Sequence, residues 1–113
     1  MQQVQKITCL NSAGFVMSFE VQYLDTSTGE WTPIPGTNSG NFPAAQSRTM
    51  DMSTVSFPSN ALLRPYVFAK GGVNKGADEY VMYADNSDNA TYRVTGATLT
   101  YSITLIGAAA LAH

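Results

Sequence analysis

The chain has 113 residues, of which 44% are hydrophobic, so it is long and apolar enough for one folded domain, and a disordered chain is excluded. Only 12% of the residues are charged and the net charge is −2, so Ser, Thr, Asn, Gln and Gly must cover most of the surface. The six Lys and Arg residues are scattered, and without a basic block no nucleic-acid partner is expected.

Apolar and polar residues alternate with a period of two along most of the chain, which predicts strands. In residues 15–24, for example, Met17, Phe19 and Val21 alternate with polar side chains. Turns rich in Gly, Pro, Asn and Ser, such as GGVNKGAD at 71–78, separate such runs, and no window of about ten residues has a helical period. The expected strands, in chain order, are 5–10, 15–24, 31–34, 48–55, 62–70, 79–84, 90–95 and 98–106.

Short strands separated by such turns predict an all-β protein, an antiparallel β-sandwich of about seven or eight strands with jelly-roll or immunoglobulin-like connections. The expected domain is 1–106, and the Ala-rich end, 107–113, is interpreted as a possible remnant of a vector-encoded linker. The residues expected in the core are Ile7, Phe15, Met17, Phe19, Val21, Tyr92, Val94, Leu99, Tyr101, Ile103 and Leu105.

The N-terminal segment lacks the basic start and apolar run of a signal peptide, and the longest apolar stretch, 105–112, is too short to span a bilayer. A protein that acts outside the cell would then leave by an unconventional route or by lysis, or a leader would have been trimmed. Storage in the cytoplasm is the alternative. The single cysteine, Cys9, cannot form an internal disulfide and is expected in the core.

The sequence offers little for catalysis. The only histidine is His113, so neither a histidine-based triad nor a multi-histidine metal site is expected. There is no nucleophile elbow and no phosphate-binding loop. The eight carboxylates lie in a domain that is small for the deep cleft of a two-carboxylate glycosidase. We therefore expect no enzyme, no metal site and no required cofactor.

The acidic stretch DNSDN at 85–89 allows several interpretations. It supplies oxygen ligands of the kind that calcium prefers, but not with EF-hand spacing, so calcium stays an alternative. Asn and Asp also favour turns, and the stretch is predicted to be the turn of a hairpin between strands 79–84 and 90–95. The glycosylation sequon at Asn89 is expected to be incidental, because no signal peptide precedes it.

Loops carried on a rigid sandwich are where binding groups usually sit. Amide and carboxylate groups that hydrogen-bond sugar hydroxyls, with an aromatic ring under the apolar face of the sugar, form a typical glycan site, and the loops of this chain supply these groups. If the loops share one end, they form a shallow pocket whose weak binding requires avidity. The predicted site residues are Trp31, Asn41, Asp78, Asp85, Asn86 and Asp88.

Four stretches together resemble the small haemagglutinin of slime moulds. They are VMSFEVQYLD (16–25), SGNFPAAQSRTMDM (39–52), LRPYVFAKGG (63–72) and ATYRVTGATLTYSITL (90–105). The resemblance implies a compact β-sandwich lectin without a signal peptide, which binds glycans or glycoproteins at the cell surface and agglutinates cells. It transfers no sugar-binding residue to this chain.

Two functions therefore stay open. A lectin that agglutinates cells needs two sites per particle, so a homo-oligomer, most simply a dimer, is expected, and it would contact membranes through glycolipids. The alternative is a membrane-binding or pore-forming toxin component. The low charge and the Ser- and Thr-rich strands at 91–105 would suit a strand-built assembly at a bilayer.

Overall fold

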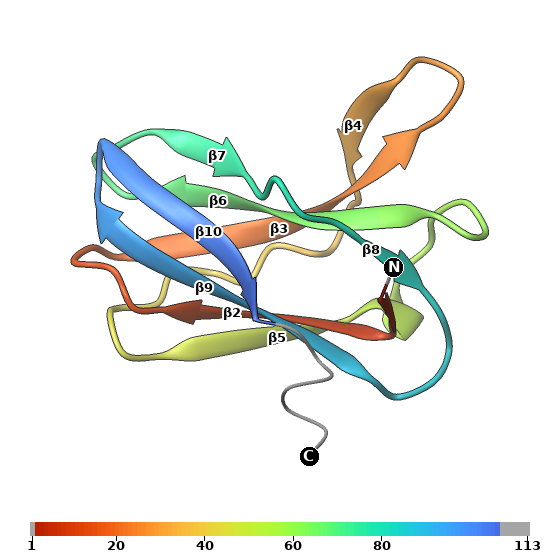
Figure 1. Ribbon diagram of the computed structural model, residues 1–113, viewed down its shortest axis with the longest axis horizontal. Helices are drawn as coiled ribbons and strands as arrows, with labels where there is room; N and C mark the ends of the chain where they lie inside the picture. The colour runs from red at the N-terminus through yellow and green to blue at the C-terminus, as the bar shows by residue number, and fades with distance from the viewer. Residues whose placement is uncertain (1, 107–113) are drawn as a thin grey trace.

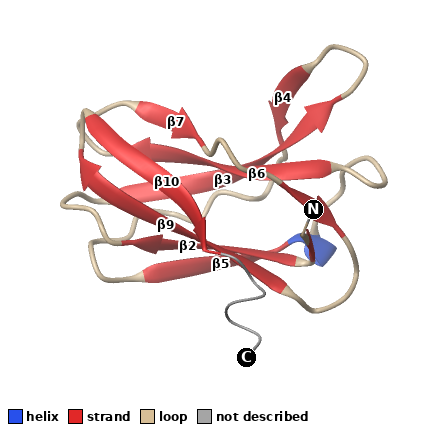
Figure 2. Ribbon diagram, in the orientation of Figure 1, coloured by secondary structure: helices blue, strands red, loops and turns tan. Residues whose placement is uncertain are grey.

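A computed structural model describes residues 2–106, which form ten strands and one short 3-10 helix (Figures 1 and 2). The predicted tail, 107–113, lies outside the described residues. The strands are β1 (Gln3–Val4), β2 (Lys6–Asn11), β3 (Met17–Asp25), β4 (Glu30–Pro33), β5 (Ser47–Asp51), β6 (Leu62–Ala69), β7 (Asn74–Gly76), β8 (Val81–Tyr83), β9 (Asn89–Ala97) and β10 (Thr100–Ile106), and the helix η1 (Met52–Thr54) follows β5.

The strands form two sheets that pack face to face, which confirms the predicted all-β sandwich (Figure 1). The first sheet has the order β1-β8-β6-β3-β4, with β7 paired along β6, and the second has the order β10-β9-β2-β5. Two pairings are parallel, β1 with β8 and β2 with β9, so the sandwich is mixed and not purely antiparallel. The strands number ten because short β1 and β7 join those expected; β7 lies in a segment that the sequence predicted as a turn.

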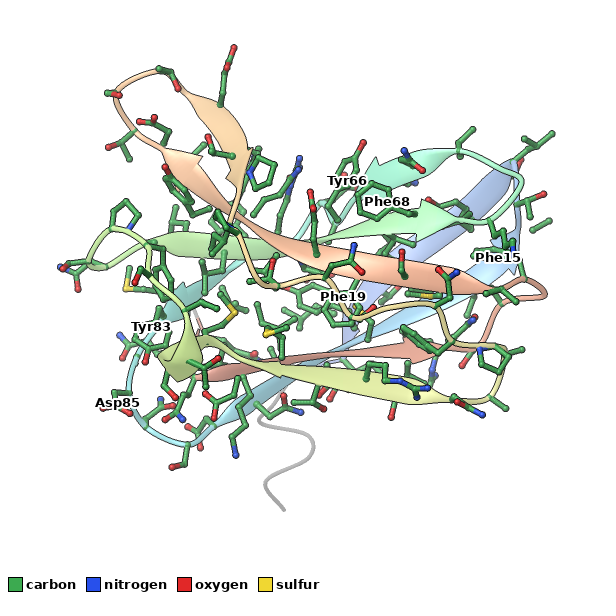
Figure 3. The ribbon with its side chains drawn as sticks, turned by 180° about the vertical axis from the view of Figure 1, so that it is seen from behind. Phe15, Phe19, Tyr66, Phe68, Tyr83 and Asp85 are labelled. Atoms are coloured by element: carbon green, nitrogen blue, oxygen red, sulfur yellow. The ribbon has the colours of Figure 1, made fainter. Side chains whose placement is uncertain are left out.

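The core lies between the sheets and follows the alternation of the strands. In β3 the side chains of Met17, Phe19 and Val21 are fully buried, and Figure 3 shows Phe19 between the two sheets. Phe19 meets Phe42 edge to face with ring centroids 6.4 Å apart, so the loop after β4 closes one side of the core. Of the predicted core residues, nine are buried and Leu105 packs against the core at its edge.

Leu99 was the one wrong core prediction, because 70% of this residue is exposed. It lies in the tight turn between β9 and β10, where Ala97 pairs with Thr100. The period-two pattern of β10 extends in the sequence through Thr98 and Leu99, but the backbone reverses there. Leu99 therefore fits the alternation that includes Tyr101 in the sequence, but in the structure it lies in the turn, outside the sheet.

The N-terminal segment explains why residues 85–88 are not a hairpin turn. β1 and β2 are two halves of one segment that leaves the first sheet at Gln5 and enters the second. The chain from β8 to β9 makes the same change of sheet alongside it: Ala84 N–H donates to Val4 O (2.9 Å), and the N–H groups of Gln5 and Lys6 donate to Asp88 O (2.9 and 3.0 Å). The predicted hairpin is wrong because the N-terminal segment takes the pairing edges of β8 and β9. Residues 85–88 form an arch between the sheets.

Candidate functional site

The structure does not bring the six predicted site residues into one pocket. Asp85, Asn86 and Asp88 lie on the arch. Trp31, on β4, and Asp78 both lie near Arg64 on the outer face of the first sheet. Asn41 is an exposed residue beside Phe42, which bridges to Met17 at the start of β3, whereas β8 and the arch lie near the other end of that strand.

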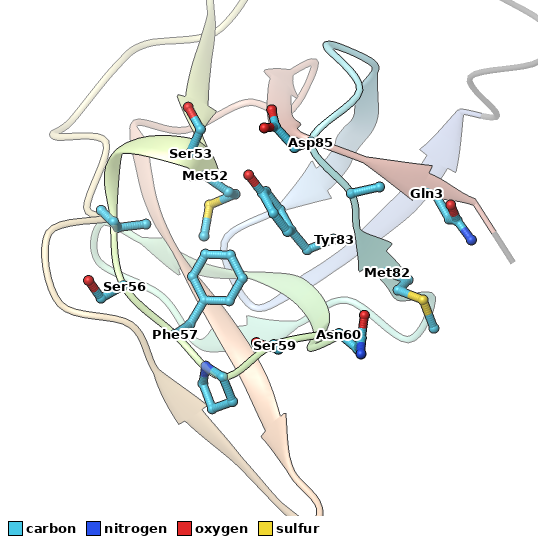
Figure 4. A pocket seen from close by; sticks show the side chains of 13 residues that line it. Gln3, Met52, Ser53, Ser56, Phe57, Ser59, Asn60, Met82, Tyr83 and Asp85 are labelled. Atoms are coloured by element: carbon cyan, nitrogen blue, oxygen red, sulfur yellow. The ribbon is translucent and has the colours of Figure 1, made fainter.

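Asp85 is the predicted residue that lines a pocket. The pocket has a volume of about 570 Å³ and lies between the β5–β6 connection and β8 (Figure 4). Phe57 and Tyr83 meet in it edge to face, with ring centroids 4.9 Å apart, and Gln3 and Asn60 add amide groups. Partial desolvation and the carboxylates of Asp85 and Asp51 raise the pKa of Tyr83, so its hydroxyl stays protonated and can donate a hydrogen bond. The pocket thus offers an aromatic wall beside a carboxylate and two amides.

The other two predicted residues of the arch have structural contacts. The Asn86 amide donates to Gln3 O (2.9 Å), and its side-chain oxygen accepts from Asp88 N–H (2.9 Å). Ser87 N–H donates to Gln5 Oε1 (3.0 Å), so the arch is fastened to the N-terminal segment at several points. In residues 2–106 no group of three or more His, Cys, Asp or Glu side chains could hold a metal ion, and the calcium alternative gains no ligand cluster.

A second surface lies at the opposite end of the sandwich, where the turns 12–16, 70–73 and 98–99 meet (left in Figure 1). We call this the loop end. Two aliphatic residues are exposed there, Leu99 (70%) and Val73 (44%). Val73 is held on both sides, because its N–H donates to Thr98 O (3.1 Å) and its C=O accepts from the Tyr101 hydroxyl (2.7 Å). The two tips are therefore fixed to each other by hydrogen bonds, and they expose two aliphatic side chains beside the exposed Lys70.

The close approach of the two tips requires a glycine. A Cβ on Gly72 would lie 2.2 Å from the carbonyl oxygen of Thr98. The turn 12–16 is joined to this pair, because Gly14 N–H donates to Gly96 O (3.2 Å) and Lys70 N–H donates to Val16 O (2.9 Å). The loop end was not predicted from the sequence, because Leu99 was assigned to the core and 71–78 was interpreted only as a turn.

A third surface is the aromatic outer face of the first sheet. Figure 3 shows Tyr66 and Phe68 on the side of β6 that faces away from the core. Beside them the guanidinium of Arg64 stacks on the ring of Trp31, 4.5 Å from its centroid, and its Nε–H donates to Gln22 Oε1 (2.9 Å). Partial burial lowers the pKa of Arg64, while Tyr66 and Asp78 act in the opposite direction, and the group stays charged. Sequence reasoning proposed Trp31 and Asp78 but not the Arg64 that lies near both.

Part of two larger proteins of known structure has a similar fold. Listeriolysin O superimposes with a TM-score of 0.50 at 17% sequence identity, and wild-type pneumolysin with a TM-score of 0.51 at 13%. Each comparison covers 89% of this chain and 22% of the other, so the chain spans about a fifth of their length. The sequence matches no family model and no curated protein. Among residues 2–106 no helix has the length and apolarity needed to cross a membrane.

Proposed function

We propose that this domain is a membrane-binding component of a pore-forming toxin and contacts the bilayer with its loop end. The observation that carries the proposal is the pair of exposed aliphatic residues, Leu99 and Val73, on two tips that are hydrogen-bonded to each other. Apolar side chains gathered at one end of a soluble domain are typical of a partner or membrane contact. The fold shared with part of the pore-forming toxins listeriolysin O and pneumolysin supports the same function.

The expected affinity of one loop end is low. Full burial of a leucine side chain contributes about 1.5–3 kcal/mol, so Leu99 at 70% exposure contributes roughly 1–2 kcal/mol on entering the hydrocarbon. A similar or smaller amount from Val73 gives reversible binding that is weaker than that of a single myristoyl chain. Stable attachment would then need several copies on one surface, which favours a homo-oligomer at the cell surface.

Vesicle binding tests this function. The wild-type protein should sediment with neutral phospholipid vesicles, and the variant Leu99→Ser with Val73→Ser should lose most of this binding. Tyr80→Ser is the matched control, because Tyr80 is 41% exposed on a different face and its loss should leave vesicle binding unchanged. Absence of wild-type binding, or equal binding by the double variant, would refute the proposed contact. Release of a trapped dye would then show whether binding leads to leakage.

Glycan binding is the second candidate function, that of a lectin or haemagglutinin. It is favoured by the pocket at the arch, where the Phe57–Tyr83 pair stands beside the carboxylate of Asp85. A glycan array would test it: Asp85→Ala should abolish the signal from neutral glycans, while Asp88→Ala, which removes an exposed carboxylate outside the pocket, should not. A lectin would cross-link glycolipid vesicles without releasing dye, in contrast to a toxin component. Both candidates are binding functions, and we propose no catalytic role.

A further inference from the structure

Arg64 is held in one position on the outer face of the first sheet. Its cross-strand neighbour Gln22 accepts the Nε–H (2.9 Å), and the ring of Trp31 covers the guanidinium at 4.5 Å. Gly76 leaves room for it, since a Cβ at that position would lie 2.4 Å from the central guanidinium carbon. An arginine side chain ordinarily loses much rotamer freedom when it binds a ligand. Arg64 has already lost that freedom, so it is a preorganised donor.

The two terminal amino groups of Arg64 have no partner in the described part of the chain. Within residues 2–106 the guanidinium makes a single hydrogen bond, through Nε, and no carboxylate lies within 4.0 Å of it. A partly buried cation that no carboxylate touches is unfavourable, and an arriving anion in contact with it would relieve that cost. The planar fork of a guanidinium matches the two oxygens of a carboxylate.

The surroundings of Arg64 suit a sugar. Trp31 and Tyr80 form an aromatic pair with centroids 5.9 Å apart and an interplanar angle of 49°, and Tyr80 is 41% exposed. Such rings pack against the apolar face of a sugar, while a tyrosine hydroxyl and a carboxylate hydrogen-bond its hydroxyls. Tyr66 and Asp78 both lie close enough to Arg64 to raise its pKa.

We propose that Arg64, Trp31 and Tyr80 form a binding site for a carboxylate-bearing sugar, with Arg64 pairing with the carboxylate. Asp78 and Tyr66 lie at the rim of this site. It is separate from both the loop end and the Asp85 pocket, so it does not depend on the membrane contact proposed above. Leu99→Ser should bind the acidic sugar normally, and loss of the acidic-sugar site should leave vesicle binding unchanged.

Trp31 is the single tryptophan of the chain, so its fluorescence reports directly on this site. Sodium glucuronate should change the fluorescence saturably, while glucose at the same ionic strength should not. Calorimetry provides a second readout for the variants, because replacing Arg64 also changes the surroundings of Trp31. Binding should be lost in Arg64→Gln and weakened about tenfold in Arg64→Lys, which keeps the charge but not the fork. Arg93→Gln, on the second sheet, is the matched control and should bind normally.

Asp78→Asn distinguishes the two kinds of sugar. Removing the Asp78 charge should strengthen glucuronate binding, since it removes a repulsion from the carboxylate. The same change should weaken binding of a neutral sugar, which would use that carboxylate as an acceptor. Equal binding of glucose and glucuronate, an equal effect of sodium acetate, undiminished binding by Arg64→Gln, or no saturable response would each overturn the proposal.

Discussion

The buried side chain of Asn11 should be a main source of stability for the loop end. Asn11 is fully buried at the end of β2, and its amide donates to Phe15 O (2.7 Å) and Phe42 O (3.3 Å). Its side-chain oxygen accepts from Ala13 N–H (3.0 Å). These bonds join the turn 12–16 to the loop that closes the core. Asn11→Ala would remove them all and leave two backbone groups, Ala13 N–H and Phe15 O, without a partner, because Phe42 O still accepts from Met17 N–H (3.1 Å).

The magnitude follows from the buried groups that lose a partner. An unsatisfied buried donor or acceptor costs about 1–3 kcal/mol, and relaxation of the turn lets water reach the two groups in part, so we expect a total loss of about 2–5 kcal/mol. This is a large fraction of the roughly 5–15 kcal/mol that stabilises a typical domain. At about 4 °C per kcal/mol for a chain of this size, the melting temperature should fall by roughly 8–20 °C.

Urea unfolding followed by circular dichroism would measure the effect of Asn11→Ala. Asn38→Ala is the matched control, because Asn38 is exposed and its side chain accepts one local hydrogen bond, from Gly40 N–H (2.8 Å). The control should lose less than about 1 kcal/mol. A loss in Asn11→Ala no greater than in Asn38→Ala would refute the reasoning that this network is buried and satisfied.

Three further predictions concern the core and the outer face. Phe19→Asp should abolish folding, because it places an unpaired charge between the sheets, and a soluble variant with unchanged melting would contradict the assigned core face. Burial raises the pKa of the Cys9 thiol, so the thiol ionises more readily in the unfolded chain than in the folded one. The free energy of unfolding should therefore be unaffected by this group below about pH 8.5 and should fall with rising pH above it. Urea titrations at several pH values would measure this slope, and Cys9→Ala should flatten it. Gly76→Ala should displace Arg64 from Trp31 and shift the tryptophan emission while circular dichroism stays that of a folded protein, and an unchanged spectrum would show that the stack tolerates the methyl group.

The parts of the fold that depend on one strand at a time could be predicted from the sequence. The alternation around Phe19 and Val21 identified β3 and its buried face correctly, because a strand with one wet face carries that information locally. The arch at 85–88 could not be predicted in this way. Its form depends on the parallel pairing of β9 with a segment more than 80 positions earlier, and the turn-forming composition of DNSDN fits an arch as well as a hairpin.

The candidate sites were predicted in part for the same reason. Trp31 and Asp78 were identified as candidates by residue type, but their common neighbour Arg64 comes from a third segment. Arg64 lies close to Trp31 only because β6 and β4 both pair with β3. One signal was available. Residues 62–69 carry large apolar or aromatic side chains on both faces, including Tyr66 and Phe68, which is unusual for a strand with one wet face.

The N-terminal segment and the β8–β9 connection pass side by side from the first sheet to the second, and this constrains how the domain can fold during synthesis. β2 lies between β5 and β9, and the hydrogen bond from Asn86 to Gln3 joins residues 83 positions apart. The second sheet therefore cannot be completed until β9, in the last third of the chain, has left the ribosome. Until then β2 has no partner on the edge that later pairs with β9. A fold dominated by such distant contacts is expected to form slowly, and a nascent chain stopped before β9 should bind chaperones or be digested by a protease where the complete domain resists both.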